Sequence, residues 1–357
     1  MKARIFNIVL LCNGILSLAV FQSAAQEQEM TKKYHETYTT TDNSHLYLDN
    51  KYGNVVINDW ENKKIEIDVV VLVGDASREK AERILSYIDV VFSQEGDDIK
   101  ATTTFDDRFS RSGDGNHKLE INYTVSMPRD IKLNLTNKYG NVSISELTGE
   151  SVIEIKYGKL NADKLLRGNE KPLTELYLAY SEASIEEAGW LKSDLKYSIL
   201  KIEKAKALVL YSKYSKIYID EASSVVNDSK YDFFDMGKLS NFVINAEYSN
   251  MKIKQVDKKL DCSTSYSDCT VNLIPAGFES ISIDNKYGHY NLGIEEAASY
   301  MLDGYAAYSK ITYHETDKIS KISENTSQKV SGLVGKDEST SSTVKVNTKY
   351  GNVKLDY

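Results

Sequence analysis

Apolar and polar residues alternate on both sides of a tyrosine that recurs along most of this sequence. Around the first such tyrosine, Tyr52, the apolar positions lie six and four residues before the ring and three and five after it: Leu46, Leu48, Val55 and Ile57. A period of two is typical of a half-buried strand, and the change from even to odd offsets indicates that the chain turns at the tyrosine. The pattern predicts two strands joined at a corner. The tyrosine lies an even number of residues after the apolar positions that precede it, so we expect its ring to point inward as they do.

The corner recurs along the chain. The octapeptide NKYGNVVI at residues 50–57 returns as NKYGNVSI at 137–144 and as TKYGNVKL at 348–355. From the second tyrosine onward the intervals are 18, 23, 17, 17, 17, 17, 18, 21, 21 and 42 residues, which indicates one structural unit repeated many times. The marker tyrosines are Tyr52, Tyr139, Tyr157, Tyr180, Tyr197, Tyr214, Tyr231, Tyr248, Tyr266, Tyr287, Tyr308 and Tyr350.

We therefore predict an all-β fold, a β-solenoid of about 12 coils with a Lys-Tyr-Gly or Lys-Tyr-Ser corner every 17–21 residues, whose repeats continue over residues 131–357. A sandwich of separate hairpins is the alternative, and the constant spacing disfavours it. The 42-residue interval is twice 21, so a degenerate coil near Gln328 or a loop over residues 339–342 is expected to fill it. The corner at Tyr350 is expected to form the last coil, with no helix to cap its edge.

Residues 26–130 form an N-terminal α+β region between the first and second corners. Residues 26–44 are polar and are expected to form an edge strand or a leading arm, and residues 65–73 (IEIDVVVLV) are typical of a strand. Apolar residues spaced by three and four then predict one helix over about residues 76–92, capped by Asp75 or Ser77. Strands are expected at residues 99–105 and 119–127, with a surface loop at residues 106–118 between them.

Residues 1–25 predict a cleaved secretory signal peptide. Lys2 and Arg4 precede an apolar run over residues 5–21, and small residues lie before Gln26. We expect export to the periplasm, the outer membrane or the medium, with no transmembrane segment after cleavage. The net charge of −8 argues against nucleic acid as a partner, because phosphate binding requires a basic surface.

The sequence resembles a family of bacterial adhesin-like proteins, the head-GIN or autotransporter-adhesin-head domains of Bacteroidetes envelope proteins. The resemblance lies in the signal peptide ending in Ala-Gln, the NKYGN corner followed by Trp60, and the strand and helix of residues 65–92. It continues in the Tyr-x-Val-x-Met-Pro strand of residues 123–128, and it covers most of the mature chain. The resemblance implies a fold without an agreed activity, and it brings no catalytic residues.

The tyrosines are expected to stack as a ladder along one corner, since each ring would pack on the next. A strip of aromatic rings for stacking on glycans is the alternative. A lysine directly precedes eight of the rings, and we interpret this row as solvated, with contact to an anion or lipid headgroup as the alternative. These lysines are Lys51, Lys138, Lys156, Lys196, Lys213, Lys230, Lys286 and Lys349.

Four acids, each six residues after a marker tyrosine, are expected to form a row on consecutive coils: Asp163, Glu186, Glu203 and Asp220. Like charges at this spacing repel, so the row would need lysines or a hard cation. No calcium-repeat loop appears, and we predict no metal and no cofactor. The five histidines are scattered and no catalytic motif is present, so the favoured prediction is a protein that is not an enzyme.

Cys262 and Cys269 lie four residues before and three after Tyr266, both at core positions. They are either small buried residues or a disulfide across the corner, which an oxidising compartment would permit.

The first functional hypothesis is a secreted or cell-envelope module that binds a protein or a glycan without catalysis. The second is a scaffold that associates end to end through the uncapped last coil. The third is a glycan-active enzyme, a lyase or hydrolase, that would use the acidic row.

Overall fold

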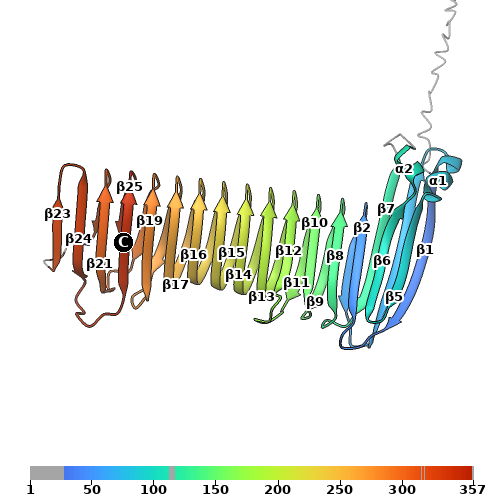
Figure 1. Ribbon diagram of the computed structural model, residues 1–357, viewed down its shortest axis with the longest axis horizontal. Helices are drawn as coiled ribbons and strands as arrows, with labels where there is room; N and C mark the ends of the chain where they lie inside the picture. The colour runs from blue at the N-terminus through green and yellow to red at the C-terminus, as the bar shows by residue number, and fades with distance from the viewer. Residues whose placement is uncertain (1–27, 112–116, 315, 317, 356–357) are drawn as a thin grey trace, which may run out of the picture.

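The structure, a computed structural model, describes residues 28–111, 117–314, 316 and 318–355. The predicted signal peptide lies outside the described residues. Strands make up most of the described chain and follow one another along the long axis of the molecule, with two short helices near one end (Figure 1). Within the described ranges, no helix has both the length and the apolar character needed to cross a bilayer.

The middle of the molecule consists of long strands that pair in parallel at a nearly constant register. Over residues 182–239 each residue lies opposite the residue 17 positions further on, so Leu200 faces Ile217 and Ile217 faces Phe234; from Asn241 onward the offset is 18. The pairing skips the residues six and nine positions after the tyrosine, as at Glu186 and Gly189. One strand therefore runs from one corner to the next. These strands are β13 (Glu182–Lys196), β14 (Ile199–Lys213), β15 (Lys216–Lys230), β16 (Phe233–Glu247) and β17 (Asn250–Ser265).

On either side of this middle region, each repeat is built from two shorter strands. The strands before the tyrosines pair in one series, as in β8–β10–β12, and the strands after them form a second series, as in β9–β11–β13. The shorter strands are β8 (Lys132–Lys138), β9 (Val142–Leu147), β10 (Ser151–Lys156), β11 (Lys159–Leu165), β12 (Thr174–Ala179), β18 (Asp268–Ile274), β19 (Ser280–Lys286) and β20 (Tyr290–Ile294).

The core lies between the two series of strands. In the repeat of Tyr197 the buried residues lie six, four and two positions before the tyrosine and one, three, five and eight positions after it. The apolar members of all repeats form one continuous cluster from Leu46 to Leu355. The alternation in the sequence is therefore the alternation between core and surface, and the predicted predominance of strands is confirmed.

Antiparallel strands cover the N-terminal end of the parallel stack. The strands of the first corner, β2 (His45–Lys51) and β3 (Val55–Asp59), pair with β8 and β9 on one side. On the other side they pair with β6 (Asp98–Phe105) and β7 (Lys118–Met127). Beyond these, pairing becomes antiparallel, because β5 (Ile88–Glu95) joins β6, and β4 (Lys64–Asp75) joins β7 and β1 (Gln28–Thr39).

The helix prediction was wrong in two respects. Helix α1 covers only Arg78–Leu85, with Ser77 as its N-cap, and the residues from Ile88 to Phe92 belong to β5. Ile88 and Phe92 fit the helical spacing of four, and together with Val90 they also fit a strand period of two; pairing with β6 decides between the two. A second helix, α2 (Asp107–Arg111), lies where only a loop was expected, so the prediction of a single helix does not hold.

The C-terminal end departs from the order of the sequence. Strands β25 (Thr343–Lys349) and β26 (Val353–Leu355) do not lie last in the stack: they pair in parallel with β19 and β20 on one side and with β21 (Tyr300–Ala307) and β22 (Ile311–Tyr313) on the other. The prediction that the Tyr350 corner forms the last coil is wrong. Antiparallel strands β24 (Ser327–Val334) and β23 (Ile319–Ser323) follow β21 at this end, so the 42-residue interval contains a hairpin (Figure 1).

Candidate functional site

The marker tyrosines form one stacked row along the corner of the molecule. All twelve have a left-handed backbone, with φ between 51° and 66°. Neighbouring ring centroids lie 4.7–5.4 Å apart, and most ring planes are within about 12° of parallel. The row follows the strand order, so Tyr350 stacks between Tyr287 and Tyr308. At the other end the edge of Phe105 packs on Tyr52.

The expectation that the rings point inward was wrong. Eleven of the twelve tyrosines are between 40% and 60% exposed, and Tyr52 is half-buried. A residue with positive φ turns its side chain away from the side that the strand period assigns to it. The next residue, Gly, Ser or Asp, takes the inward position instead, which explains why the buried positions after the corner have odd offsets.

Each corner is held by hydrogen bonds from one repeat to the next, and the small residue after the tyrosine decides which side chain makes them. Where it is serine, its Oγ accepts from the serine N–H of the preceding repeat, as between Ser181 and Ser198 at 3.2 Å and between Ser198 and Ser215 at 3.2 Å. In corners that have Gly-Asn, the asparagine side chain makes the link in the opposite direction and accepts from the N–H of the following repeat, as when Asn54 Oδ1 accepts from Asn141 N at 2.9 Å. The recurrent Tyr-Gly-Asn and Tyr-Ser are therefore two solutions to one structural requirement.

Asp232 is the exception in the row of serines. Its side chain is buried, with Oδ1 accepting from Ser215 N at 2.6 Å and Oδ2 accepting from Ser229 Oγ at 2.7 Å. Burial raises the pKa of this carboxyl, and the hydrogen bonds counteract the rise only in part.

The lysines beside the rings lie on the surface, and some contact the tyrosines. The Nζ of Lys51 lies 4.6 Å from the centroid of Tyr52, and those of Lys213 and Lys349 lie 5.5 and 5.2 Å from their tyrosines. Lys156 and Lys230 form ion pairs with neighbouring acids. The lysine row is thus partly neutralised and does not form a single cationic stripe.

A groove of about 530 Å³ runs beside four of the rings. One wall consists of Tyr214, Tyr231, Tyr248 and Tyr266. The other wall consists of the first side chains of the strands that follow, Lys216, Phe233, Asn250 and Asp268. Because the faces of the rings are covered by their neighbours, the groove meets ring edges and hydroxyl groups. The apolar face of a sugar ring therefore cannot stack on an interior tyrosine, which changes the form of the predicted glycan strip.

The four acids of the predicted row lie together. Asp163, Glu186, Glu203 and Asp220 are exposed and line one hollow of about 550 Å³, along with Lys201 and Tyr218. No ion pair within the described residues involves these four acids, and the nearby Lys164 pairs instead with Glu146 at 3.7 Å. The row thus lines an acidic hollow on the surface of the stack.

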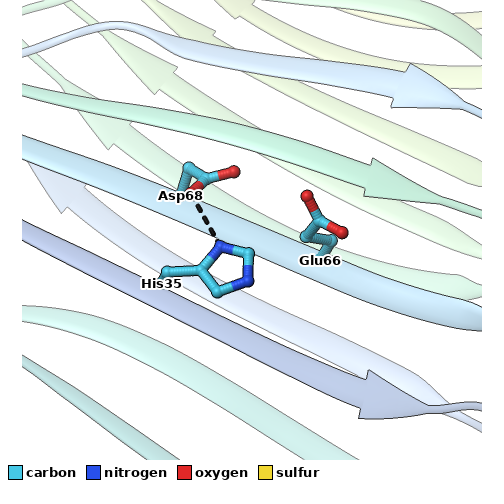
Figure 2. A group of neighbouring side chains, drawn as sticks. All are labelled: His35, Glu66 and Asp68. Carbon is cyan, nitrogen blue, oxygen red and sulfur yellow. Dashed lines mark hydrogen bonds and ion pairs between the residues drawn. The ribbon is translucent and has the colours of Figure 1, made fainter.

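One group of side chains that the sequence did not single out has the composition of a cation site. His35 of β1 lies opposite Asp68 of β4, and its Nδ1 is 2.8 Å from Asp68 Oδ1, with Glu66 beside them (Figure 2). The Asp68 carboxylate raises the pKa of His35. Both partners of the ion pair are at least half exposed, so we interpret the group as a surface ion pair across two antiparallel strands.

Cys262 and Cys269 face each other in the core as free thiols in hydrogen-bonding contact. This contact and burial raise the pKa of Cys269. The buried hydroxyl of Tyr290 lies near both thiols and is 2.7 Å from Thr264 Oγ1.

Comparison with known proteins gives structural neighbours and no family. No family model matches this chain, and no curated protein matches its sequence. A putative adhesin from Bacteroides fragilis is 12% identical over 91% of this chain and 97% of its own, with a TM-score of 0.28. A putative cell adhesion protein from Clostridium sporogenes is 8% identical over 92% and 99%, with a TM-score of 0.20.

A putative lipid binding protein from Parabacteroides distasonis is 8% identical over 92% of this chain and 97% of its own, with a TM-score of 0.30. These identities and TM-scores do not fix the family or the ligand of this chain. The resemblance to head-GIN domains stays a prediction.

Proposed function

We propose that this chain is an exported, non-catalytic binding module of the cell envelope, released from a signal peptide over residues 1–25. Its parallel stack is proposed to be a β-solenoid of about 12 coils, preceded by the N-terminal region of residues 26–130. The ligand is proposed to be a linear polysaccharide that lies along the groove beside Tyr214, Tyr231, Tyr248 and Tyr266.

The proposal rests on the regular spacing of hydrogen-bonding groups along one wall of the groove. It presents one tyrosine hydroxyl per repeat, with ring centroids 4.9 Å apart. The opposite wall supplies a cation, an amide, a carboxylate and an aromatic ring. A regular row of hydrogen-bonding groups on a rigid stack suits a polymer that repeats along one axis, and the stack holds the groups in place before binding.

A set of Tyr→Phe substitutions tests the groove. Phenylalanine keeps the ring stack and removes only the hydroxyl, so replacing all four groove tyrosines should leave the fold intact and weaken polysaccharide binding at least about tenfold. Affinity electrophoresis against neutral, acidic and amino polysaccharides gives the readout. The matched control replaces Tyr139, Tyr157, Tyr180 and Tyr197, which lie in the same row away from this groove. Equal binding by both variants, or no binding to any polysaccharide by the native chain, would refute the proposal.

A glycan-active enzyme is the second candidate, because the acidic hollow combines four carboxylates with Lys201 and Tyr218. The same polysaccharides, assayed for new reducing ends or unsaturated products, test it. Product formation that is lost in Glu186→Gln and Glu203→Gln would favour the enzyme over the binding module.

End-to-end association rested on an uncapped last coil. Since β25 and β26 are paired on both sides and the hairpin of β23 and β24 covers β21, that observation does not hold.

A further inference from the structure

The last corner of the chain fills a slot between two earlier repeats. We call residues Thr343–Leu355, which form β25 and β26, the donor segment, and the space between the repeats of Tyr287 and Tyr308 the slot. Without the donor segment, β19 and β21 would be two strand spacings apart, about 9–10 Å, too far for backbone hydrogen bonds. Removing the donor segment would therefore leave an unpaired strand edge on each wall of the slot.

The donor segment binds both walls through its backbone. On one side Tyr287 N donates to Lys349 O at 2.9 Å, and Tyr290 N donates to Asn352 O at 2.9 Å. On the other side Tyr350 N donates to Ala307 O, and Val353 N donates to Lys310 O, both at 3.0 Å. Its apolar side chains are at most 4% exposed: Val344, Val346, Val353 and Leu355. Inserting the segment thus supplies both the backbone hydrogen bonds to β19 and β21 and the apolar side chains of the core at this position.

The fit is also specific in sequence. Asn285 Nδ2 donates to Thr348 Oγ1 at 3.1 Å, and Asn352 Oδ1 accepts from Lys310 N at 2.9 Å. A Cβ at Gly351 would lie 1.9 Å from the carbonyl oxygen of Gly288, so only glycine fits there. The slot is therefore specific for a segment whose apolar residues fit the core and whose polar residues fit the hydrogen-bonding groups of the two walls.

The connection to the donor segment is short and lies mostly on the surface. Residues 335–342 join β24 to β25 and can extend over roughly 26–29 Å. Ser299 Oγ accepts from Lys336 N and Asp337 N at 3.0 Å each, and Glu338 forms an ion pair with Lys318. Ser342, whose Oγ donates to Phe278 O, is the only buried one of these eight residues, so rearranging the connection disturbs the core mainly at its last residue.

We propose that the slot also accepts the donor segment of a second copy of this chain, so that two copies exchange Thr343–Leu355 and complete each other. The contacts in the slot are the same whichever copy supplies the segment, so only the connection and the association entropy distinguish the two states. The internal donor prevails at low concentration, because a short tether gives it a high effective concentration. Exchange prevails where chains fold close together.

Cross-linking between copies tests the exchange in the full chain. Asp284 and Asn347 are exposed and lie opposite each other, with Asn347 Nδ2 3.2 Å from Asp284 Oδ1. One copy carries only Asp284→Cys and the other only Asn347→Cys, both with Cys262→Ala and Cys269→Ala. The two are refolded together at rising concentration and oxidised, and disulfide-linked dimers are measured on a non-reducing gel. Exchange predicts heterodimers that increase with concentration.

The matched control places the cysteines at Asp194 and Tyr211, which face each other on β13 and β14 in consecutive repeats. Exchange there would require opening the continuous stack, so heterodimers from the first pair should exceed those from the control at least about tenfold. Equal yields at every concentration would overturn the proposal. Because the alanine background could fold poorly, tagged and untagged native chains are also refolded together, and failure of tagged dimers to contain untagged chain overturns it independently.

Discussion

At the scale of single residues, the corner tyrosine carries a conformational cost that its neighbours offset. A left-handed backbone costs a non-glycine residue about 1–2 kcal/mol, and every marker tyrosine adopts it. Each interior ring stacks on two others, and such pairs contribute about 0.5–1.5 kcal/mol each beyond area burial. The cost of the left-handed backbone and the gain from ring stacking are of similar size, so tyrosine is favourable at this position only as part of the row.

This balance makes the ring necessary and the hydroxyl dispensable for stability. Tyr197, which stacks on Tyr180 at 5.0 Å and Tyr214 at 4.9 Å, is a suitable test position. Tyr197→Ala should lower the free energy of unfolding by about 1–3 kcal/mol, because two stacked pairs are lost, whereas Tyr197→Phe should change it by less than about 0.5 kcal/mol. Urea denaturation gives both values. The control is Tyr211→Ala, an exposed tyrosine outside the row, and an equal loss there would contradict the role of stacking.

Asp232 should make stability depend on pH. Since burial raises its pKa in the folded state, the folded chain binds this proton more tightly than the unfolded chain does. Its contribution is most favourable below the ordinary pKa of an aspartate and is lost as the pH rises through the raised value. Asp232→Ser, which installs the residue found at six other corners, should raise the melting temperature at pH 7, and the gain should shrink as the pH falls towards about 4.

Asp235, which is exposed on β16 three residues after Asp232, provides the charge-matched control. Asp235→Ser should give little change at either pH. A gain at pH 7 that is equal in the two variants would mean that net charge, and not burial, causes the effect.

The sequence predicted which residues surround the corner better than it predicted the corner itself. Leu133, Leu135, Val142 and Ile144 are buried as the alternation requires. The ring of Tyr139 points outward because one residue with a left-handed backbone reverses the alternation of side chains between core and surface. The alternation of apolar and polar residues in the sequence carries no information on φ, so it could not predict this reversal. The small residue after each tyrosine was the signal in the sequence that could have predicted the outward ring. The residue that points inward at the corner packs against the next repeat, and at the twelve corners it is Gly, Ser or Asp.

At the scale of elements, pairing between strands that are distant in the sequence determined the strand order, which the local pattern of apolar residues did not predict. The donor segment has the same alternation as every other corner, so nothing in it indicates that β25 pairs with β19 and β21 out of order. The hairpin of β23 and β24 was similarly hidden, because weak apolar positions suit a degenerate coil and an antiparallel cap alike. The four acids of the predicted row lie together because each occupies the same position relative to its tyrosine, and the extra residues of the 23-residue interval come after Asp163.

The facing cysteines should form a disulfide between the strands before and after Tyr266 when the chain folds in an oxidising compartment. The thiols already contact each other, and closing this short loop should stabilise the fold by about 2–3 kcal/mol in the chain-entropy account. Intact mass with and without reductant should differ by two hydrogens, and the melting temperature should fall on reduction. Cys262→Ser should abolish both differences; two free thiols in protein taken from an oxidising compartment would contradict the prediction.

At the scale of the whole molecule, each repeat contacts only its neighbours along one axis, although the donor segment couples repeats that are distant in sequence. In such a stack, stability is approximately a sum of repeat and interface terms, so damage in one place should remain local. The antiparallel strands at both ends limit the exposed edges to which further strands of the parallel stack could add.

A cavity in the centre measures how far damage extends. Leu208 on β14 is 1% exposed, and Leu208→Ala should cost about 2–5 kcal/mol. Hydrogen exchange should then lose protection in β13, β14 and β15, with less change at β8 and least at β2, because opening one repeat removes the edges that its neighbours need. Val226→Ala, at an exposed position on the adjacent strand, should leave the profile nearly unchanged. A uniform loss of protection from β2 to β26 would instead show that the whole stack opens as a single cooperative unit, and the one-dimensional description would have to be abandoned.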